Sequence, residues 1–174
     1  MADDIHILLV EDNPADIRLI REMLLASSNE RILLDSVVTL ADALAHVEQR
    51  NYDAILLDLS LPDSHGLDTL HRITAQAFNT AIVVLTGMDD ESVGIEAVQT
   101  GAQDYLPKDH VDSRLLTRSI RYAIERHCTE MALRRSQEEY RSLIDDVFNT
   151  SMVAVLILDR EYRVVWCNQA TEIY

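Results

Sequence analysis

The chain is short of several residue types, and each shortage excludes a class of protein. Its 174 residues include two cysteines, Cys128 and Cys167. Two distant cysteines cannot build a disulfide framework or a metal knuckle, so we expect free thiols in a reducing cytoplasm. The longest apolar run, Met152 to Leu158, is far shorter than the ~18–20 residues of a membrane span. Residues 1–4 also lack the basic start of a signal peptide, so no membrane anchor or leader is predicted.

Basic residues are scarce in the first two thirds of the chain. Residues 1–111 hold 20 acidic and 6 basic side chains, a charge of −14, whereas residues 112–174 hold 10 and 9, a charge of −1. An acidic surface repels a phosphate backbone, so we expect no nucleic-acid binding. Hydrophobic residues nevertheless make up 48% of the chain, which is enough for a full core.

Glycine and proline are absent after Pro107, which allows one long helix from Ser113 to Val147. Its first half has apolar residues that can close a preceding domain, but residues 129–146 are mostly charged. This segment fits either a dimeric coiled coil or a solitary exposed helix, and we favour the dimer. The heptad seam would consist of Tyr122, Leu133, Tyr140, Leu143 and Val147, with Arg126, Thr129 and Ser136 at the remaining seam positions.

Hydrophobic strands alternate with helical segments over residues 1–127. The strands are expected at 5–10, 32–38, 54–58, 81–86 and 102–106, and the helices at 14–25, 40–49, 67–77 and 89–100. Alternation of this kind implies right-handed crossovers and a parallel sheet covered on both faces. The pattern predicts a doubly wound α/β domain.

Chemically matched side chains stand where these strands end. Glu11 and Asp12 follow the first strand, Asp58 closes the third, Thr86 closes the fourth, and Lys108 follows the fifth. The carboxyl ends of parallel strands share one edge of the sheet, where ligands bind in open α/β folds. Carboxylates, a hydroxyl and one ammonium at that edge suit a hard divalent cation and a phosphoryl group.

This constellation resembles the receiver domain of bacterial two-component response regulators, over residues 5–127. The resemblance implies a flavodoxin-like sheet with the strand order 2-1-3-4-5. It also implies that Asp58 accepts a phosphoryl group from a sensor histidine kinase or a phosphotransfer protein. In this family an acidic pair, the acceptor and a loop carbonyl hold Mg²⁺. Those metal ligands correspond here to Glu11, Asp12, Asp58 and Ser60.

The same resemblance assigns the remaining site residues. Thr86 and Lys108 would stabilise the phosphoryl oxygens, and Thr86 and Tyr105 would form the switch that changes the face around the fourth helix, fifth strand and fifth helix.

The C-terminal part resembles a second family. Residues 133–143 are similar to the linker helix that leads into PAS sensor domains, and residues 153–168 to the first PAS hairpin and the start of its next helix. We therefore expect a receiver at 1–127, a helical linker at 128–148, and the opening of a PAS domain at 149–174. A homodimer through residues 129–150 follows from the helix.

Two other functions are considered. An aspartyl-phosphate phosphohydrolase of the haloacid-dehalogenase type needs a second Asp two residues after the nucleophile, but that position is Ser60. A pseudo-receiver that only docks partners usually lacks the acceptor or the acidic pair, and both are present. We expect the receiver domain not to be an enzyme in the usual sense. The identity of an output domain, such as a diguanylate cyclase or a histidine kinase, is left open.

Overall fold

The computed structural model describes residues 4–27, 31–87, 91–149 and 156–167. It divides into two units, Met1–Thr129 and Glu130–Tyr174. The strands are β1 (Ile5–Val10), β2 (Ile32–Val37), β3 (Ala54–Asp58), β4 (Ser60–Leu61), β5 (Ser64–His65), β6 (Ala81–Thr86), β7 (Asp104–Pro107), β8 (Leu156–Leu158) and β9 (Val164–Cys167). The helices are α1 (Pro14–Ser27), α2 (Leu40–Gln49), α3 (Leu67–Gln76), α4 (Glu91–Thr100), η1 (Lys108–His110) and α5 (Ser113–Asn149).

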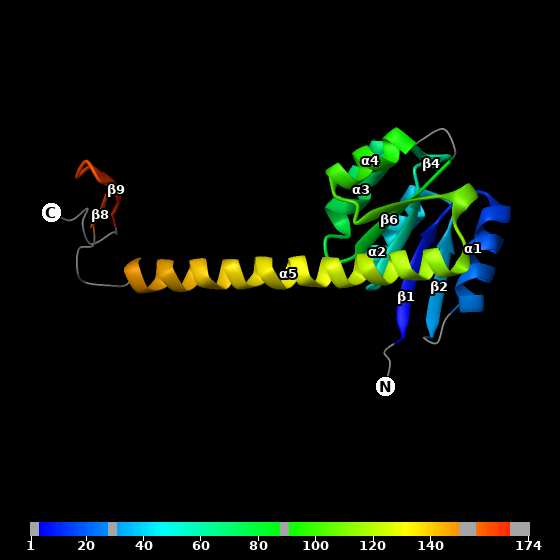
Figure 1. The fold of residues 1–174 in the computed structure, drawn as a ribbon, viewed down its shortest axis with the longest axis horizontal. Coiled ribbons are helices and arrows are strands. Elements are labelled where there is room, and N and C mark those ends of the chain that lie inside the picture. Colours follow the sequence, from blue (N-terminus) through cyan, green and yellow to red (C-terminus); the bar gives the residue numbers. More distant parts are fainter. Residues whose placement is uncertain (1–3, 28–30, 88–90, 150–155, 168–174) are drawn as a thin grey trace. The chain divides into compact units, whose positions relative to one another are not determined.

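Five strands form a parallel sheet in the order β2-β1-β3-β6-β7 (Figure 1). Numbered within this sheet alone, the order is 2-1-3-4-5, so the predicted fold is confirmed. The chain leaves β1 toward β2 and then crosses to β3 on the other side of β1. The direction of winding therefore reverses between β1 and β3, and such a switch point leaves a crevice at the carboxyl ends of the strands.

Both faces of this sheet are buried, which explains why its central strands are continuously hydrophobic. Along β3, Ile55 and Leu57 point into one core and Leu56 into the other. The first core is covered by α2, α3 and α4, and the second by α1 and the first half of α5 (Figure 1).

The segment after Asp58 contains a short hairpin that the sequence did not predict. Strands β4 and β5 form a short antiparallel ladder in which Ser60 pairs with His65 and Leu61 pairs with Ser64. Leu61 is fully buried and anchors the turn in the core. The alternation of hydrophobic and polar residues could not predict this hairpin, because each of its strands is only two residues long.

The second unit contains the end of α5 and the antiparallel pair β8–β9. The turn between these strands is held by Asp159, whose Oδ1 accepts hydrogen bonds from the backbone N–H groups of Glu161 and Arg163, both at 2.9 Å. The predicted strand start at 153–155 and the helix start after 168 lie outside the described residues. Among the described helices, none combines the length and the hydrophobicity that a membrane crossing requires.

Candidate functional site

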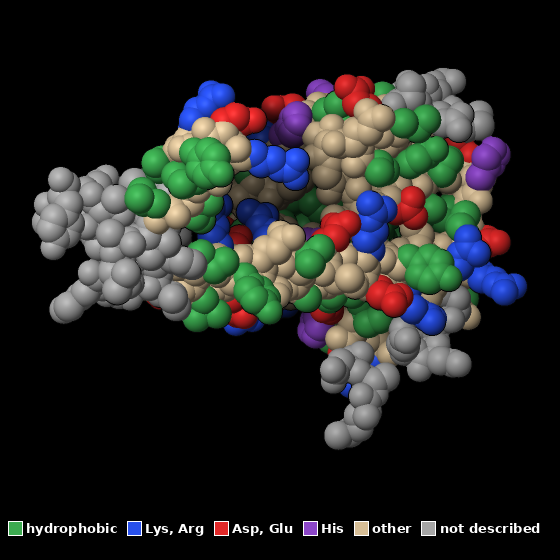
Figure 2. All heavy atoms as spheres, turned by 60° about the vertical axis from the view of Figure 1, so that its left-hand side comes forward, with side chains coloured by type: hydrophobic (Ala, Val, Ile, Leu, Met, Phe, Trp, Pro, Cys, Tyr) green, Lys and Arg blue, Asp and Glu red, His purple; other side chains and the backbone are tan. Residues whose placement is uncertain are grey.

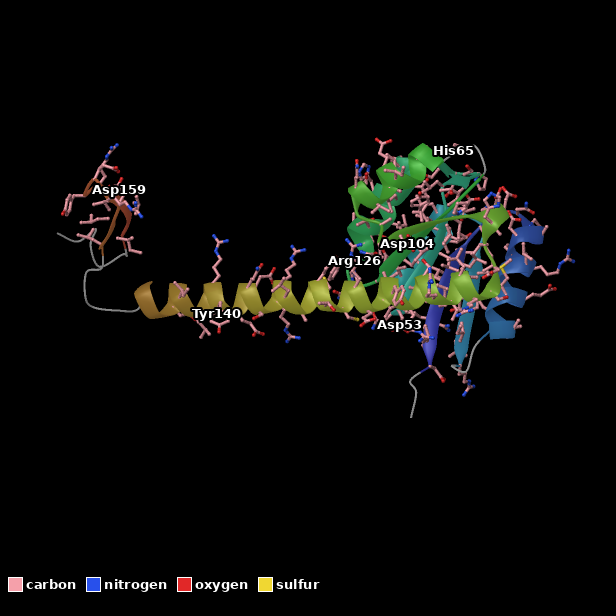
Figure 3. All side chains as sticks on the ribbon, viewed as in Figure 1. Asp53, His65, Asp104, Arg126, Tyr140 and Asp159 are labelled. Carbon is pink, nitrogen blue, oxygen red and sulfur yellow. The ribbon has the colours of Figure 1, made fainter. Side chains whose placement is uncertain are left out.

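Three carboxylates meet at the carboxyl ends of β1 and β3. Each of Glu11, Asp12 and Asp58 offers an oxygen, and these oxygens lie within 4.8 Å of one another. Glu11 and Asp58 are buried, whereas Asp12 is exposed and leaves the cluster open to solvent. Figure 3 shows His65 and Asp53 at opposite ends of this sheet, and the cluster lies at the His65 end, because Asp58 closes the strand that starts after Asp53.

Lys108 lies inside this acidic cluster. Its Nζ is 2.6 Å from Glu11 Oε2 and 2.7 Å from Asp58 Oδ2. Burial alone would lower the pKa of the Lys108 ammonium, but hydrogen bonds with Asp58 and Glu11 outweigh it, so the pKa is raised. Lys108 therefore stays charged at every physiological pH.

The buried carboxyl of Glu11 is shifted by the same surroundings. Burial raises its pKa, the hydrogen bond with Lys108 opposes this effect, and the nearby charge of Asp58 raises the pKa further. The net direction of the pKa is upward, because the cost of burying the charged carboxylate, together with the repulsion from Asp58, outweighs the attraction of Lys108. A divalent cation would relieve this crowding, and carboxylate oxygens are the hard donors that Mg²⁺ prefers. The residues present therefore fit a magnesium site.

A fourth carboxylate was not predicted from the sequence. Asp16, in the first turn of α1, lies 3.2 Å from Lys108 Nζ through its Oδ2. An acid in the first turn of a helix is common, since it suits the helix dipole. No local signal therefore distinguished Asp16, and only the packing of α1 beside the sheet brings it to Lys108.

The β4–β5 hairpin fixes the backbone beside Asp58. The N–H of Ser60 donates to Asp58 Oδ1 at 2.9 Å, and the N–H of Gly66 donates to the Leu59 carbonyl at 2.7 Å. Hydrogen-bonded and non-bonded pairs alternate in an antiparallel ladder, so the pair after Leu59–Gly66 is a non-bonded one. That pair is Ser60–His65, and its ladder geometry leaves the Ser60 carbonyl available to a cation.

Thr86 closes β6, the strand next to β3. In the register of these strands Asp58 is opposite Leu85, so Thr86 lies one residue further toward the same edge. The hydroxyl of Thr86 is buried and has no hydrogen-bond partner among the described residues. A buried hydroxyl is normally paired, so this one is suited to a group that arrives during function.

Tyr105, on β7, packs against α4. Its half-buried ring lies over Gly94, where a Cβ atom would come within 2.8 Å of the ring carbon Cγ. Gly94 therefore has a packing reason that the sequence did not reveal, since a glycine inside a helix usually weakens it. The position of the Tyr105 ring and that of α4 depend on each other.

The loop that carries Ser60 also caps a helix. Asp63, in the β4–β5 turn, accepts hydrogen bonds from the backbone N–H groups of Leu40 and Ala41, both at 2.9 Å. Desolvation would raise the pKa of Asp63, but these two bonds lower it below the ordinary value. The next donor, Asp42 N–H, is bound by the Thr39 hydroxyl at 3.1 Å, so two residues from different loops share the start of α2.

Known proteins are similar to this chain in sequence. A model of the response regulator receiver domain matches residues 7–120. The transcriptional regulatory protein BasR of Escherichia coli (strain K12) is 36% identical over 121 residues, which cover 70% of this chain and 53% of BasR. The transcriptional regulatory protein CutR of Streptomyces coelicolor is 34% identical over 119 residues, covering 65% of this chain and 51% of CutR. The chain thus spans about half the length of these relatives.

Solved structures agree with the sequence relatives. The receiver domain of sensor histidine kinase PA1611 from Pseudomonas aeruginosa PAO1 superimposes with a TM-score of 0.61 at 30% identity, over 71% of this chain and 99% of that one. That structure holds a magnesium ion coordinated in the active site cleft. A sensor protein from Polaromonas sp. JS666 matches with a TM-score of 0.62 at 28% identity, over 71% of this chain and 98% of that one. Sheet order, acidic cluster and family match agree, and the chain belongs to the response regulator receiver domain family.

Proposed function

We propose that Asp58 accepts a phosphoryl group from a phosphohistidine of a sensor histidine kinase or phosphotransfer protein. Receiver domains take phosphoryl groups from such kinases, which gives the class of reaction. The observation that carries the residue assignment is the contact between Asp58 and Lys108 at 2.7 Å inside an open acidic cluster. A nucleophile, a fixed positive charge and hard oxygen donors are the parts that phosphoryl transfer to a carboxylate requires.

The transfer is a direct displacement at phosphorus. An oxygen of Asp58 forms a bond to the phosphorus as the P–N bond of the phosphohistidine breaks. The electron pair of that bond stays with the imidazole, which leaves as a neutral ring when its other nitrogen carries a proton. The product is an acyl phosphate on Asp58.

Two anions must approach each other in this step, so their charge has to be neutralised. Mg²⁺, when bound, would supply two positive charges between the carboxylate and the phosphoryl oxygens. Its protein ligands would be Glu11, Asp12, Asp58 and the carbonyl of Ser60. Lys108 would pair with a phosphoryl oxygen as a point charge.

The switch is assigned to Thr86 and Tyr105. The unpaired hydroxyl of Thr86 would donate to a phosphoryl oxygen, which draws the end of β6 toward Asp58. Tyr105 lies on the adjacent strand and packs against Gly94, so a change at this strand end reaches α4. Phosphorylation would then shift the face formed by α4, β7 and α5 between two states.

Intact-mass measurement after incubation with acetyl phosphate and Mg²⁺ tests the acceptor. In this reaction the P–O bond of the donor breaks and acetate leaves. We expect one added phosphoryl group in the wild type and none in Asp58→Asn or without Mg²⁺. Asp53→Asn is the matched control, because Asp53 precedes the same strand but lies at its other end. Labelling of Asp58→Asn equal to that of the control would refute the assignment.

The metal ligands have a separate test. Asp12 is the exposed member of the acidic cluster, whereas the contacts of Lys108 involve Glu11, Asp16 and Asp58. Asp12→Ala should therefore remove most Mg²⁺ affinity while leaving the Lys108 contacts in place. Calorimetric titration with Mg²⁺ measures this, and unchanged affinity would rule out the site. The variant should also be somewhat more stable to heat without metal, since one of several repelling carboxylates is gone.

We also propose the domain plan of a receiver at 1–127, a helical linker at 128–148 and the opening of a PAS domain at 149–174. The break between the two compact units at Thr129 and the antiparallel β8–β9 pair support this plan. A cytoplasmic location is proposed with it, because phosphohistidine donors are made from ATP. We also propose an output domain beyond the PAS region, either a diguanylate cyclase or a histidine kinase.

The second half of α5 supports a homodimer through residues 129–150. Leu133, Tyr140 and Leu143 follow a heptad spacing and are 61%, 68% and 62% exposed. Figure 2, in which this part of the chain comes forward, shows hydrophobic side chains on its surface. The side chain of Val147, the last predicted seam position, is outside the described residues.

Light scattering tests the dimer. We expect residues 1–174 to be dimeric and Leu143→Glu to be monomeric. Leu25→Glu is the control, because Leu25 is even more exposed than Leu143, at 74%, but lies on α1. A monomeric wild type, or a fragment 1–127 that dimerises as well as the whole chain, would show that the helix is not the dimerisation element.

A further inference from the structure

We propose that Asp16 is a positioning residue for Lys108 that competes with the phosphoryl group for this ammonium. The inference rests on the proposed function of Asp58 and deepens it. It concerns how strongly the site attracts and retains a phosphoryl group, which the acceptor, the metal ligands and Thr86 do not explain alone.

The ammonium of Lys108 has three N–H donors, and three carboxylates surround it. Glu11 Oε2 lies at 2.6 Å, Asp58 Oδ2 at 2.7 Å and Asp16 Oδ2 at 3.2 Å from Nζ. Lys108 donates hydrogen bonds to Asp58 and Asp16, whereas its contact with Glu11 Oε2 is an ion pair without hydrogen-bond geometry. A phosphoryl oxygen therefore shares the charge of Lys108 with these partners, and Lys108 is the chain's only lysine.

The three partners change differently during phosphorylation. Asp58 becomes the acyl phosphate and loses its carboxylate charge, and Glu11 is a proposed metal ligand. Asp16 belongs to neither role, because it lies outside the group of acids whose oxygens converge within 4.8 Å. Its carboxylate has no part in the bond to phosphorus or in the proposed metal site, so it remains available to Lys108 and competes with the phosphoryl oxygen.

A purely structural role for Asp16 at the start of α1 is already filled by another residue. Asn13 Oδ1 accepts a hydrogen bond from the Ala15 N–H at 3.0 Å, and the Asn13 carbonyl accepts one from the Ile17 N–H at 3.0 Å. Asn13 thus caps this helix. The side chain of Asp16 is directed instead to an ammonium 92 residues away in the chain.

Electrostatics decides the direction of the effect. Glu11, Asp16 and Asp58 place three carboxylates around the Lys108 ammonium, Asp12 lies beside them, and the incoming donor is also an anion. Removing the charge of Asp16 lowers the repulsion and frees part of the Lys108 field for the phosphoryl oxygens. We expect phosphorylation by acetyl phosphate to become roughly 3–10-fold faster, the size expected for one partly exposed charge at this range.

Asp109 offers a matched control. It lines the same small cavity as Asp16 and Lys108, and it is exposed. The described residues form no ion pair with it. Asp109→Asn therefore removes the same charge from the same neighbourhood without touching the Lys108 contact, and the rate should change less than about twofold.

The experiment follows the intact mass of the full chain with time at saturating Mg²⁺ and limiting acetyl phosphate. Asp16→Asn should be faster by the stated factor, Asp16→Ser should change in the same direction, and Asp16→Glu should reverse most of the increase. The lifetime of the acyl phosphate after donor removal should lengthen in the two neutral variants, because Asp16 then no longer draws Lys108 away from the phosphoryl group. Raising the salt concentration should shrink the differences.

Several outcomes overturn the inference. Rates in Asp16→Asn and Asp16→Ser that are unchanged or slower than wild type would do so, as would an Asp109→Asn variant that accelerates equally. In each of these cases the wild type is still labelled at Asp58, so the proposed function stands. A wild type that takes up no phosphoryl group overturns the proposed function, and the role of Asp16 with it.

Discussion

The two units of this chain use hydrophobic side chains in opposite ways. In Met1–Thr129, Leu56 and Leu57 are completely buried because helices cover both faces of the sheet. In Glu130–Tyr174, the three residues of β8 are about half exposed, and Leu133 and Leu143 of α5 are more exposed. These side chains are equally hydrophobic in both units. Burial is therefore a property of the surrounding layers, and the second unit presents surface that another layer can cover.

The largest expected effect comes from exchanging one leucine in each unit. Leu56→Ala should lower the free energy of unfolding of the first unit by about 2–5 kcal/mol, since it removes buried atoms and leaves a cavity. Leu133→Ala, the same change at a 61% exposed position, should cost less than about 0.5 kcal/mol in dilute monomeric protein. Urea unfolding followed by circular dichroism measures both. Equal losses would mean that Leu133 is buried in solution.

A smaller effect is expected where α4 meets β7 within the first unit. Gly94→Ala forces the Tyr105 ring to move, which should destabilise the unit by about 1–3 kcal/mol. In a Tyr105→Ala background the clash is gone, and the better helix propensity of alanine should stabilise by up to ~1 kcal/mol. The double-mutant cycle thus predicts a change of sign. Destabilisation of the same size in both backgrounds would show that the ring does not occupy this space.

The smallest of the three effects concerns the Asp63 cap. Asp63→Ala should cost about 1 kcal/mol at neutral pH, because the N–H groups of Leu40 and Ala41 lose their acceptor. The pKa of Asp63 is lower in the folded state than its ordinary value of 3.8, so the carboxylate adds stability above that pH. This contribution fades as the pH falls below 3.8 and through the folded value.

Thermal unfolding between pH 3 and pH 7 checks the cap. The curves of the wild type and Asp63→Ala should approach each other at the acidic end. Asp109→Ala is the control, since Asp109 is also exposed but caps no helix among the described elements. A constant gap between wild type and variant across this range would assign the loss to something other than the charge of Asp63.

The fold and the central site follow from local patterns. Continuous hydrophobic runs alternating with helical segments predict a parallel sheet. The carboxyl ends of parallel strands all lie at the same edge of such a sheet. That is why the sequence alone groups Glu11, Asp12, Asp58 and Lys108 at one edge of the sheet. Helix α2 has the predicted bounds. Strand β7 starts at Asp104 rather than Ala102, and the Ala102 N–H donates to the Ala97 carbonyl of α4 instead of to β6.

The sequence by itself thus determined the sheet, its buried strands and the identity of the acids at its edge, because these depend on periodicity and on strand ends. Tertiary structure alone decided that Asp16 reaches Lys108, that Asp63 caps α2 and that the Tyr105 ring lies over Gly94. Each of these contacts joins residues on different elements. Their distance depends on how a helix or loop packs against the sheet, and no pattern within a single segment encodes that packing.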